Sequence, residues 1–398
     1  MTKAAGPPPP SSTRRPHGGA FPPIPALLPN LVAAGRLVAR KPQLFSVAAH
    51  NVSYRLIHRV VRARTRGWTL PPEQITVVAT DICNLRCKMC QYAFSEDPSY
   101  QLNRLGKLPF ALFRKVMDEI PGRPLVTFTG GEPLINTAVP EFIAYAKRKG
   151  RFCTLTTNGW FLADHARALC DAGLDILIVS VDGPPDVHDQ IRGPRSFERL
   201  TQGIEAILRE PRRPIVLISM AITEMNDDRL LDSLAQARAF GVDGMNFNHL
   251  WSQVDEVVEA HNGHHANLFT ADRVAWSLLP NRIDTELVAD QLERARSRRL
   301  ADGFLILESP FLTRRQIGVW YRDPARFVKW NTTRCAWMRL KLTPDGKVKP
   351  CRGWEAGDLT QEHAMRIWNG PQLRLFRQTL ASRGTFPICA RCCALAHR

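Results

Sequence analysis

The chain has 398 residues, 44% of them hydrophobic, with ten cysteines and a formal net charge of +17 at pH 7. This length and composition can bury a sizeable core and indicate a globular protein. The sequence lacks an apolar run that could span a bilayer and an apolar signal-peptide core near its start, and cysteines clustered in a long chain favour reduced thiols over a disulfide framework. We therefore expect a cytoplasmic protein.

The positive charge is concentrated in residues 1–72, which hold two lysines, nine arginines and no Asp or Glu. Residues 1–22 have the Pro- and Arg-rich composition of a disordered tail, and residues 23–72 predict a helical arm. The last helix of the arm is amphipathic and carries arginines on one face: Arg55, Arg59, Arg62 and Arg66. It could lie on an anionic membrane, pack on the rest of the protein or dock an acidic electron donor. Nucleic acid is not expected, because these arginines are not interleaved with stacking aromatic residues.

Between residues 73 and 250, strand-like apolar runs alternate with helical segments. The predicted strands are Ile75–Ala79, Leu125–Thr129, Cys153–Thr157, Ile176–Val181, Ile215–Ile222 and Met245–His249. The predicted helices are Phe110–Ile120, Val139–Lys149, Leu162–Ala172, Phe197–Leu208 and Asp227–Phe240. Six such units predict an α/β fold with a parallel sheet, whose ligands gather at the C-terminal ends of the strands.

The stretch from Leu250 to Asn281 is less regular and contains His261, His264 and His265. These histidines have no cysteine or carboxylate at ligand spacing, so we expect a solvated loop rather than a metal site. A helix over Thr285–Arg299 and a strand over Phe304–Glu308 are predicted to follow.

Three cysteines stand on one short loop after the first strand: Cys83, Cys87 and Cys90. A cubane iron-sulfur cluster has four irons, so three cysteines leave one iron open for another ligand, as a catalyst needs. A structural zinc site is the alternative, but zinc prefers four closed ligands and this loop offers a single Cys-x2-Cys pair.

Polar and glycine-containing segments follow the next strands. They are Thr129-Gly-Gly-Glu-Pro133, Thr156-Thr-Asn-Gly159, Val179-Ser-Val-Asp-Gly183 and Val187-His-Asp-Gln-Ile-Arg-Gly193. With the cysteine loop, in this order, they resemble the radical S-adenosylmethionine (radical SAM) superfamily.

The resemblance implies a partial (β/α)6 TIM-like barrel over residues 73–310, with a [4Fe-4S] cluster on Cys83, Cys87 and Cys90 whose open iron binds S-adenosylmethionine. Gly130, Gly131, Glu132 and Pro133 would hold the amino group of this cofactor. Ser180 and Asp182 would lie near its ribose, Arg192 would pair with its carboxylate, and Asn158 would belong to the same site. Met89 stands where the family often has an aromatic residue, and the fifth strand lacks the glycine pattern of some members.

A second cysteine set lies near the end of the sequence. Residues 335–351 predict a hairpin that turns at Pro344-Asp345-Gly346 and has Cys335 and Cys351 at its ends, and Cys389, Cys392 and Cys393 follow. Four thiolates in two pairs could also hold zinc. The spacing, with Trp354, Gly357 and Trp368, resembles the SPASM/Twitch extension of radical SAM enzymes.

That resemblance implies a small α+β iron-sulfur domain over residues 311–398. With the cysteines available we expect one auxiliary [4Fe-4S] cluster on Cys335, Cys351, Cys389 and Cys392, and Cys393 would be a spare thiol or an alternative ligand. Cys153 and Cys170 are most simply buried structural cysteines.

The resemblance implies reductive cleavage of S-adenosylmethionine to a 5′-deoxyadenosyl radical, which abstracts hydrogen from a substrate. A flavodoxin- or ferredoxin-type protein would donate the electron, and the auxiliary cluster would aid oxidation or substrate binding. We expect a peptide or a small metabolite as substrate, with a lipid at the membrane surface as the alternative. A non-catalytic iron-sulfur or zinc-binding protein is the alternative of another class. No general base is assigned, because strand-end residues such as His249 and Glu224 are more often structural.

Overall fold

The structure is a computed structural model. It describes residues 35, 37–39, 41–42, 57, 65–95, 101–252, 254–271, 273–274, 278, 280–297, 303–324, 326, 331–333, 335–351, 354–383, 385–392 and 395–397. The predicted tail, most of the helical arm and Cys393 lie outside these residues.

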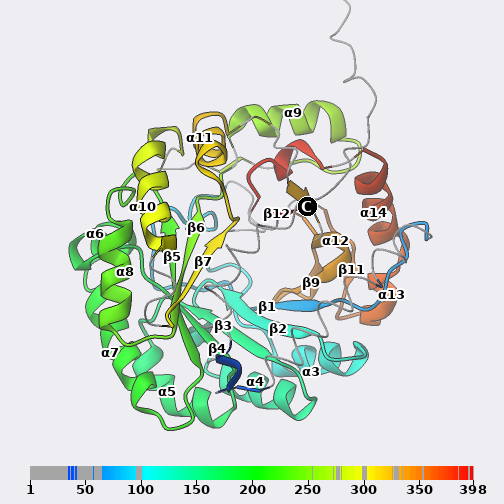
Figure 1. Ribbon diagram of the computed structural model, residues 1–398. Coiled ribbons are helices and arrows are strands. Elements are labelled where there is room, and N and C mark those ends of the chain that lie inside the picture. The colour runs from blue at the N-terminus through cyan, green and yellow to red at the C-terminus, as the bar shows by residue number, and fades with distance from the viewer. Residues whose placement is uncertain are drawn as a thin grey trace, which may run out of the picture.

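The centre of the molecule is an eight-stranded sheet with the order β7-β6-β5-β4-β3-β2-β1-β9 (Figure 1). Its strands are β1 (Gln74–Thr80), β2 (Leu125–Gly130), β3 (Cys153–Thr157), β4 (Ile176–Ser180), β5 (Ile215–Ile222), β6 (Gly244–His249), β7 (Leu305–Ser309) and β9 (Arg339–Leu342). All neighbouring strands are parallel. The six predicted strands are confirmed, and β7 and β9 extend the sheet at its two edges.

Helices connect the strands and cover the outer face of this partial barrel. They are α3 (Phe110–Glu119), α4 (Val139–Arg148), α5 (Leu162–Asp171), α6 (Pro185–Arg192), α7 (Ser196–Arg209), α8 (Leu230–Ala239), α10 (Thr285–Ser297) and α11 (Arg314–Arg322), with short 3-10 helices at Pro133–Ile135, Pro280–Arg282 and Pro387–Cys389. The five helices predicted between the strands are confirmed.

Side chains alternate between two environments along each strand. On β2, Val126 and Phe128 join the main apolar core, where Phe113 of α3 stacks on Phe142 of α4 with ring centroids 4.7 Å apart. The opposite face of the sheet is half-buried and largely polar, and includes Thr127, Thr129, Ser180, Ser219, Asn246, Asn248 and Lys341. Because successive residues of a strand point to opposite faces, the barrel interior is a polar space suited to a ligand.

The predicted loop is wrong where the three histidines stand, because Asp255–His265 forms helix α9. Val257, Val258 and His261 lie on its buried face, and His261 Nε2 is 3.2 Å from the carbonyl oxygen of Phe269. The three histidines led us to predict a solvated segment. The packing of the helix follows instead from Val257 and Val258, the apolar residues on the same buried face as His261.

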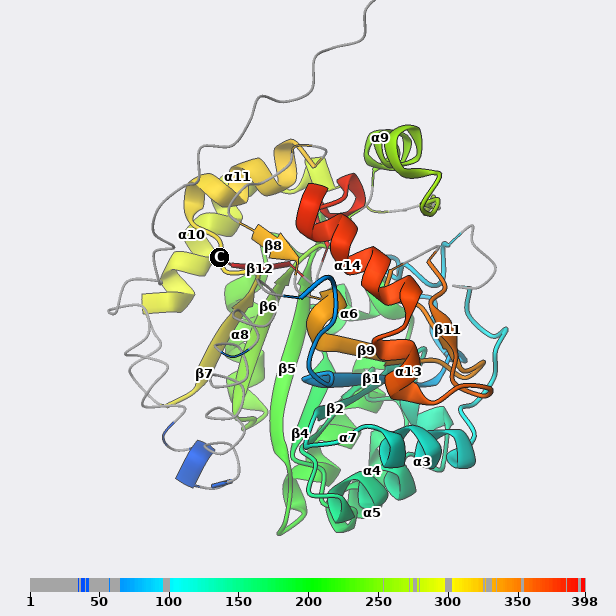
Figure 2. The ribbon, with the colours of Figure 1, turned by 90° about the vertical axis from the view of Figure 1, so that its right-hand side faces the viewer.

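The C-terminal segment contains β8 (Asn331–Thr333), α12 (Cys335–Met338), β10 (Lys347–Val348), β11 (Gly357–Asp358), α13 (Ala364–Trp368), α14 (Pro371–Arg383) and β12 (Leu395–His397). Figure 2 shows α13 and α14 beside β1 and β9 at the edge of the barrel. The predicted turn is present, since Gly346 has a φ of 73° and its N–H donates to the Thr343 carbonyl at 2.9 Å. The predicted hairpin is wrong, because β9 pairs with β1 and β10 pairs with β11.

The change of partner has a physical reason. Leu340 and Leu342 of β9 enter the main core beside β1, where an unpaired edge strand would otherwise be exposed. In the described part of the chain, none of the helices has the length and apolar character needed to cross a bilayer.

Candidate functional site: two cysteine sets and the pocket between them

The first cysteine set lies on the loop that leaves β1. Cys87 is buried, and Cys83 and Cys90 are partly exposed. The loop is held in place by backbone hydrogen bonds, from Lys88 N–H to the Ile191 carbonyl at 3.0 Å and from Cys90 N–H to the Cys87 carbonyl at 2.9 Å. It is therefore fastened to the end of α6 as well as to β1.

Burial favours the neutral thiols of Cys83 and Cys87 as long as no metal is bound. Burial raises the pKa of Cys83 to about 12, and Cys87 and Cys90 add to the rise. Burial also raises the pKa of Cys87, although Arg192 opposes the rise. Metal ligation must therefore remove the protons, as it does when thiols bind iron or zinc.

Gly130 and Gly131 allow the end of β2 to pack directly against the cysteine loop. The Gly131 N–H donates to the Thr80 carbonyl at 2.8 Å, and a Cβ atom on Gly131 would lie 2.3 Å from the Ile82 carbonyl oxygen. At Gly130 a Cβ atom would lie 2.1 Å from the Thr80 carbonyl oxygen. These glycines thus allow close contact between two protein segments, and their contact with a cofactor stays a prediction.

Glu132 joins the ends of β2 and β3. Its buried carboxylate accepts hydrogen bonds from the Leu134 N–H at 3.1 Å, the Thr157 hydroxyl at 2.7 Å and the Asn158 N–H at 2.7 Å. Burial raises the pKa of this carboxyl, and the three hydrogen bonds oppose the rise. Asn158 also donates from Nδ2 to Asn84 Oδ1 at 3.0 Å, which connects the end of β3 to the cysteine loop.

Arg192 and Asp182 form a buried ion pair beside the cysteine loop. Arg192 Nε is 2.5 Å from Asp182 Oδ2, and Asp182 Oδ1 accepts the Ala221 N–H at 2.8 Å. Arg192 Nη1 lies 3.9 Å from Cys87 Sγ. Burial alone would lower the pKa of Arg192, but Asp182 and Cys87 raise it, so the guanidinium stays charged. Ser180 is the register partner of Ser219 on the half-buried inner face.

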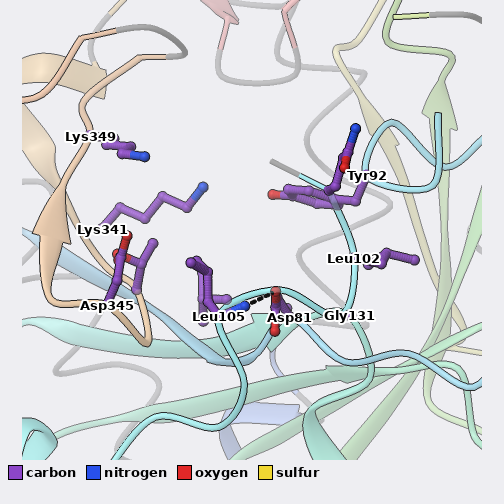
Figure 3. Close-up of a pocket in the computed structure, with 12 residues that line it drawn as sticks. Asp81, Tyr92, Leu102, Leu105, Gly131, Lys341, Asp345 and Lys349 are labelled. Atoms are coloured by element: carbon purple, nitrogen blue, oxygen red, sulfur yellow. Dashed lines mark hydrogen bonds between the residues drawn. The ribbon is translucent and has the colours of Figure 1, made fainter. Parts of the chain in front are cut away.

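A pocket lies beside the glycine segment and faces the C-terminal domain (Figure 3). Its apolar wall includes Val78, Leu102 and Leu105, and Gly130 and Gly131 also line it. Tyr92 contributes from the first cysteine loop, and the remaining lining comes largely from the segment between Cys335 and Cys351: Lys341, Thr343, Asp345 and Lys349.

The second cysteine set is assembled from separate elements. Cys335 begins α12, Cys351 follows β10, and Cys389 ends the 3-10 helix Pro387–Cys389. Burial raises the pKa of Cys389, and Cys351 and Cys335 raise it further, so the three thiols interact. The Cys392 N–H donates to the Cys389 carbonyl at 3.3 Å, one turn away. Aromatic rings pack around this region in a second core: Phe269, Trp337, Trp354, Phe376 and Phe386.

Within the described ranges, no three His, Cys, Asp or Glu side chains lie close enough together to hold one metal ion.

Two buried arginines that the sequence did not reveal support the second set. Arg391 lies between Cys389 and Cys392, and Arg377 of α14 donates from Nε to the Ala336 carbonyl at 2.7 Å, next to Cys335. Because arginine is usually a surface residue, nothing in the sequence marked these two as buried.

Several other residues that the sequence singled out have protein partners or lie buried. His249 is buried between the Tyr321 hydroxyl at 2.8 Å and Glu308 Oε1 at 3.1 Å, and Glu224 lies 3.6 Å from Arg282 Nη1. Cys153 and Cys170 are buried.

Comparisons with known proteins agree with this arrangement. A family model described as the radical SAM superfamily matches residues 77–237, and a model described as the SPASM iron-sulfur cluster-binding domain matches residues 334–393. Together they cover more than half of the chain. The chain belongs to the radical SAM superfamily and carries a C-terminal SPASM extension. The two matched domains imply a [4Fe-4S] cluster, S-adenosylmethionine and auxiliary iron-sulfur ligation.

Two curated relatives resemble parts of the chain. An AdoMet-dependent heme synthase of Oleidesulfovibrio alaskensis is 35% identical over 131 residues, which are 32% of this chain and 32% of the relative. A GTP 3',8-cyclase of Nautilia profundicola is 31% identical over 175 residues, 43% of this chain and 54% of the relative. The chain thus spans about a third to a half of these relatives.

Solved structures share the fold. Streptococcus suis SuiB bound to precursor peptide SuiA has a TM-score of 0.59 at 13% identity, covering 83% of this chain and 74% of that one. Native anSMEcpe with bound AdoMet has a TM-score of 0.54 at 17% identity, covering 76% of this chain and 82% of that one.

Proposed function

We propose that the protein cleaves S-adenosylmethionine reductively and uses the resulting radical to take hydrogen from a peptide or a small metabolite. When bound, the cluster and this cofactor supply a 5′-deoxyadenosyl radical. The chain supplies the ligands, holds the cofactor and keeps water away from the reacting atoms.

The observation that supports this most directly is the placement of Arg192. Its guanidinium is paired with Asp182 and lies 3.9 Å from Cys87 Sγ, on the loop that would hold the first cluster. A cofactor carboxylate at this loop would meet a charged, planar donor that Asp182 orients. Asp182 therefore acts through Arg192 in this proposal, as well as lying near the ribose.

The remaining cofactor contacts follow from the ends of the strands. Gly130, Gly131, Glu132 and Pro133 would offer backbone groups to the cofactor amino group, while Glu132 fixes their position through the end of β3. Asn158 would hold the cysteine loop through Asn84, and Ser180 would face the cofactor from the inner side of β4.

We propose that Cys335, Cys351, Cys389 and Cys392 hold one auxiliary [4Fe-4S] cluster, which accepts an electron from the substrate or helps to bind it. A flavodoxin- or ferredoxin-type protein would supply the electron for the first cluster. In this proposal, residues 73–310 form the radical SAM core and residues 311–398 the auxiliary domain.

The known activities and ligands in the names of similar proteins support both substrate classes. SuiB was crystallised with a precursor peptide, and the curated relatives include a heme synthase and a GTP cyclase. The lipid alternative depends on the arginine helix of the arm, which lies almost wholly outside the described residues.

Anaerobic reconstitution tests the proposal. With dithionite and S-adenosylmethionine, we expect the protein to form 5′-deoxyadenosine, and the triple variant Cys83→Ala, Cys87→Ala, Cys90→Ala to form none. Cys170→Ala is the matched control and should keep the activity. A triple variant that is as active as the wild type would contradict the assignment.

A further inference from the structure

We propose that the indole N–H of Trp354 donates a hydrogen bond to a sulfur atom of the auxiliary cluster and makes that cluster easier to reduce. The inference rests on the proposed function, because it requires a cluster on Cys335, Cys351, Cys389 and Cys392. It adds a residue that sets how readily this cluster accepts an electron.

Trp354 is a buried donor without a protein acceptor. Its side chain is 3% exposed, and among the described residues no atom accepts a hydrogen bond from its Nε1. Two other buried indoles do have an acceptor. Trp320 Nε1 donates to the Leu250 carbonyl at 3.3 Å. Trp368 Nε1 donates to the Leu70 carbonyl at 2.7 Å. Because a buried N–H without a partner costs free energy, Trp354 needs an acceptor that the described residues do not supply.

The backbone places this indole beside the second cysteine set. The backbone N–H of Trp354 donates to the Cys351 carbonyl at 3.3 Å, and the two residues form an antiparallel bridge. Residues paired in this way project their side chains to the same face, with Cβ atoms about 5 Å apart. Cys351 is also close enough to Cys389 to raise the pKa of that thiol. The indole therefore lies on the face of the bridge from which the Cys351 thiolate would bind the cluster.

The surroundings of the indole are apolar. Its ring meets the rings of Phe269 and Phe376 edge-on, with centroids 5.4 and 5.0 Å away, in the buried core that also contains Cys389. The ring of His261 packs on Phe269 at 4.5 Å, and its Nδ1 is a second polar atom of this region without a partner. A thiolate or sulfide carries negative charge and accepts a hydrogen bond more strongly than this neutral nitrogen, so the indole donor belongs to the cluster.

The hydrogen bond has a definite effect on the cluster. Reduction adds negative charge, so an N–H donor at a sulfur atom stabilises the reduced form more than the oxidised form. Trp354 therefore raises the reduction potential of the auxiliary cluster. This suits the cluster to accepting an electron from the substrate, which is the oxidising role in the proposed function.

Pulsed EPR on the auxiliary cluster tests the hydrogen bond directly. The full-length triple variant Cys83→Ala, Cys87→Ala, Cys90→Ala lacks the ligands of the first cluster, so after anaerobic reconstitution and chemical reduction the signal comes from the auxiliary cluster alone. With tryptophan labelled with ¹⁵N in the indole ring, we expect a ¹⁵N hyperfine coupling to the reduced cluster. Adding Trp354→Phe should abolish the coupling. Trp337→Phe, the matched change in the same buried core, should leave it in place.

Potentiometric titration provides a second measurement. At the midpoint potential of the triple variant, adding Trp354→Phe should lower the ratio of reduced to oxidised cluster at least threefold, and adding Trp337→Phe should change it little. The inference is overturned if no ¹⁵N coupling is seen before any tryptophan is replaced, or if the coupling persists in Trp354→Phe. The indole would then donate elsewhere, for example to His261 Nδ1.

Iron and sulfide analysis of the same samples shows whether the auxiliary cluster is present. A sample that holds the cluster but shows no coupling contradicts the role of Trp354 alone. A sample without a cluster overturns the proposed auxiliary site together with this inference, so the two failures are seen separately.

Discussion

At the residue scale, Arg391 links the second cysteine set to the barrel. Its side chain is 1% exposed and lies over the Trp320 ring, with Cζ 5.0 Å from the centroid. The guanidinium donates to the backbone carbonyls of Val319, Trp320, Asp323, Arg326 and Ala390 at 2.6 to 3.1 Å. Helix α11 ends at Arg322, so the positive charge satisfies carbonyls at its C-terminus.

Replacing Arg391 should therefore destabilise the protein and the second cysteine set together. Each buried carbonyl left without a donor costs roughly 1 kcal/mol or more, so we expect Arg391→Met to lower the free energy of unfolding by about 3 kcal/mol. Arg391→Lys should recover only part of this free energy of unfolding, because lysine lacks the planar donors of the guanidinium group. Anaerobic urea unfolding and iron content are the measurements. The control is Arg212→Met, since Arg212 is 79% exposed and pairs with Asp171 at the surface. Equal unfolding of the two Met variants would refute the linking role.

Gly131 gives a second prediction at this scale. A Cβ atom there would lie 2.3 Å from the Ile82 carbonyl oxygen and 2.7 Å from that of Asp81, both next to the first cysteine set. Gly131→Ala should push the loop away, reduce the iron bound at the first site and weaken S-adenosylmethionine binding at least tenfold in equilibrium dialysis. The matched change is Gly263→Ala, on α9, where the added methyl meets nothing within 4 Å. It should stabilise the helix by up to ~1 kcal/mol and leave cofactor binding unchanged. Wild-type affinity in Gly131→Ala would disprove the close-packing argument.

At the scale of elements, β4 and α6 are joined by a buried histidine. His188 has no exposed surface, and its Nδ1 accepts the Asp182 N–H at 3.2 Å. An accepting Nδ1 requires the neutral ring with its proton on Nε2. Burial, followed by the nearby Arg192 charge, lowers the pKa of His188 to about 2. The turn that carries Asp182, the partner of Arg192, therefore needs this ring uncharged.

This predicts a pH dependence of stability with a definite sign. In the unfolded chain His188 binds a proton below a pH of about 6.5, whereas the folded protein does not until a far lower pH. His188 therefore does not change the free energy of unfolding above a pH of about 6.5. Below that pH the free energy of unfolding falls, by about 2 kcal/mol at pH 5.0. Asparagine can keep the acceptor without titrating. When the pH falls from 7.5 to 5.0, the wild type should therefore lose about 2 kcal/mol more of its free energy of unfolding than His188→Asn does. A pH-independent difference would show that the ring is protonated in the folded state.

The same scale explains what sequence reasoning could and could not reach. The six inner strands and their helices follow from local apolar periodicity, and the cysteine and glycine segments fall at strand ends, where ligands gather. The pairing of β9 with β1 joins residues more than 250 positions apart, which no local pattern encodes. Local turn chemistry therefore predicted the turn at Gly346 correctly. It predicted the wrong pairing partners for the strands on either side of that turn. Four of the carbonyls around Arg391 likewise come from residues 319–326, which are distant in sequence.

At the scale of the whole molecule, the main apolar core extends from the barrel into the C-terminal segment. Leu340 and Leu342 of β9, Val348 of β10 and Trp368 of α13 belong to the same apolar cluster as β1 and β2. Polar contacts reinforce this junction: Trp368 Nε1 donates to the Leu70 carbonyl at 2.7 Å, and the Ala364 N–H donates to Glu119 Oε2 at 2.7 Å. We therefore expect the two proposed domains to unfold as one cooperative unit rather than separately.

Leu340 is the residue with which to test this coupling, because it is 1% exposed and belongs to the strand that crosses between the two domains. Leu340→Ala should lower the free energy of unfolding by about 2 to 5 kcal/mol. Native-state hydrogen exchange should show the same decrease at amides of β3, inside the barrel, and of α14, in the auxiliary domain. Leu375→Ala, at a side chain that is 44% exposed on α14, should change neither by more than about 0.5 kcal/mol. A decrease confined to α14 would mean that the auxiliary domain opens independently. The pocket wall carrying Lys341 and Lys349 would then be free to move away from the first cysteine set, whereas a shared decrease means that the pocket is built as part of a single folded unit.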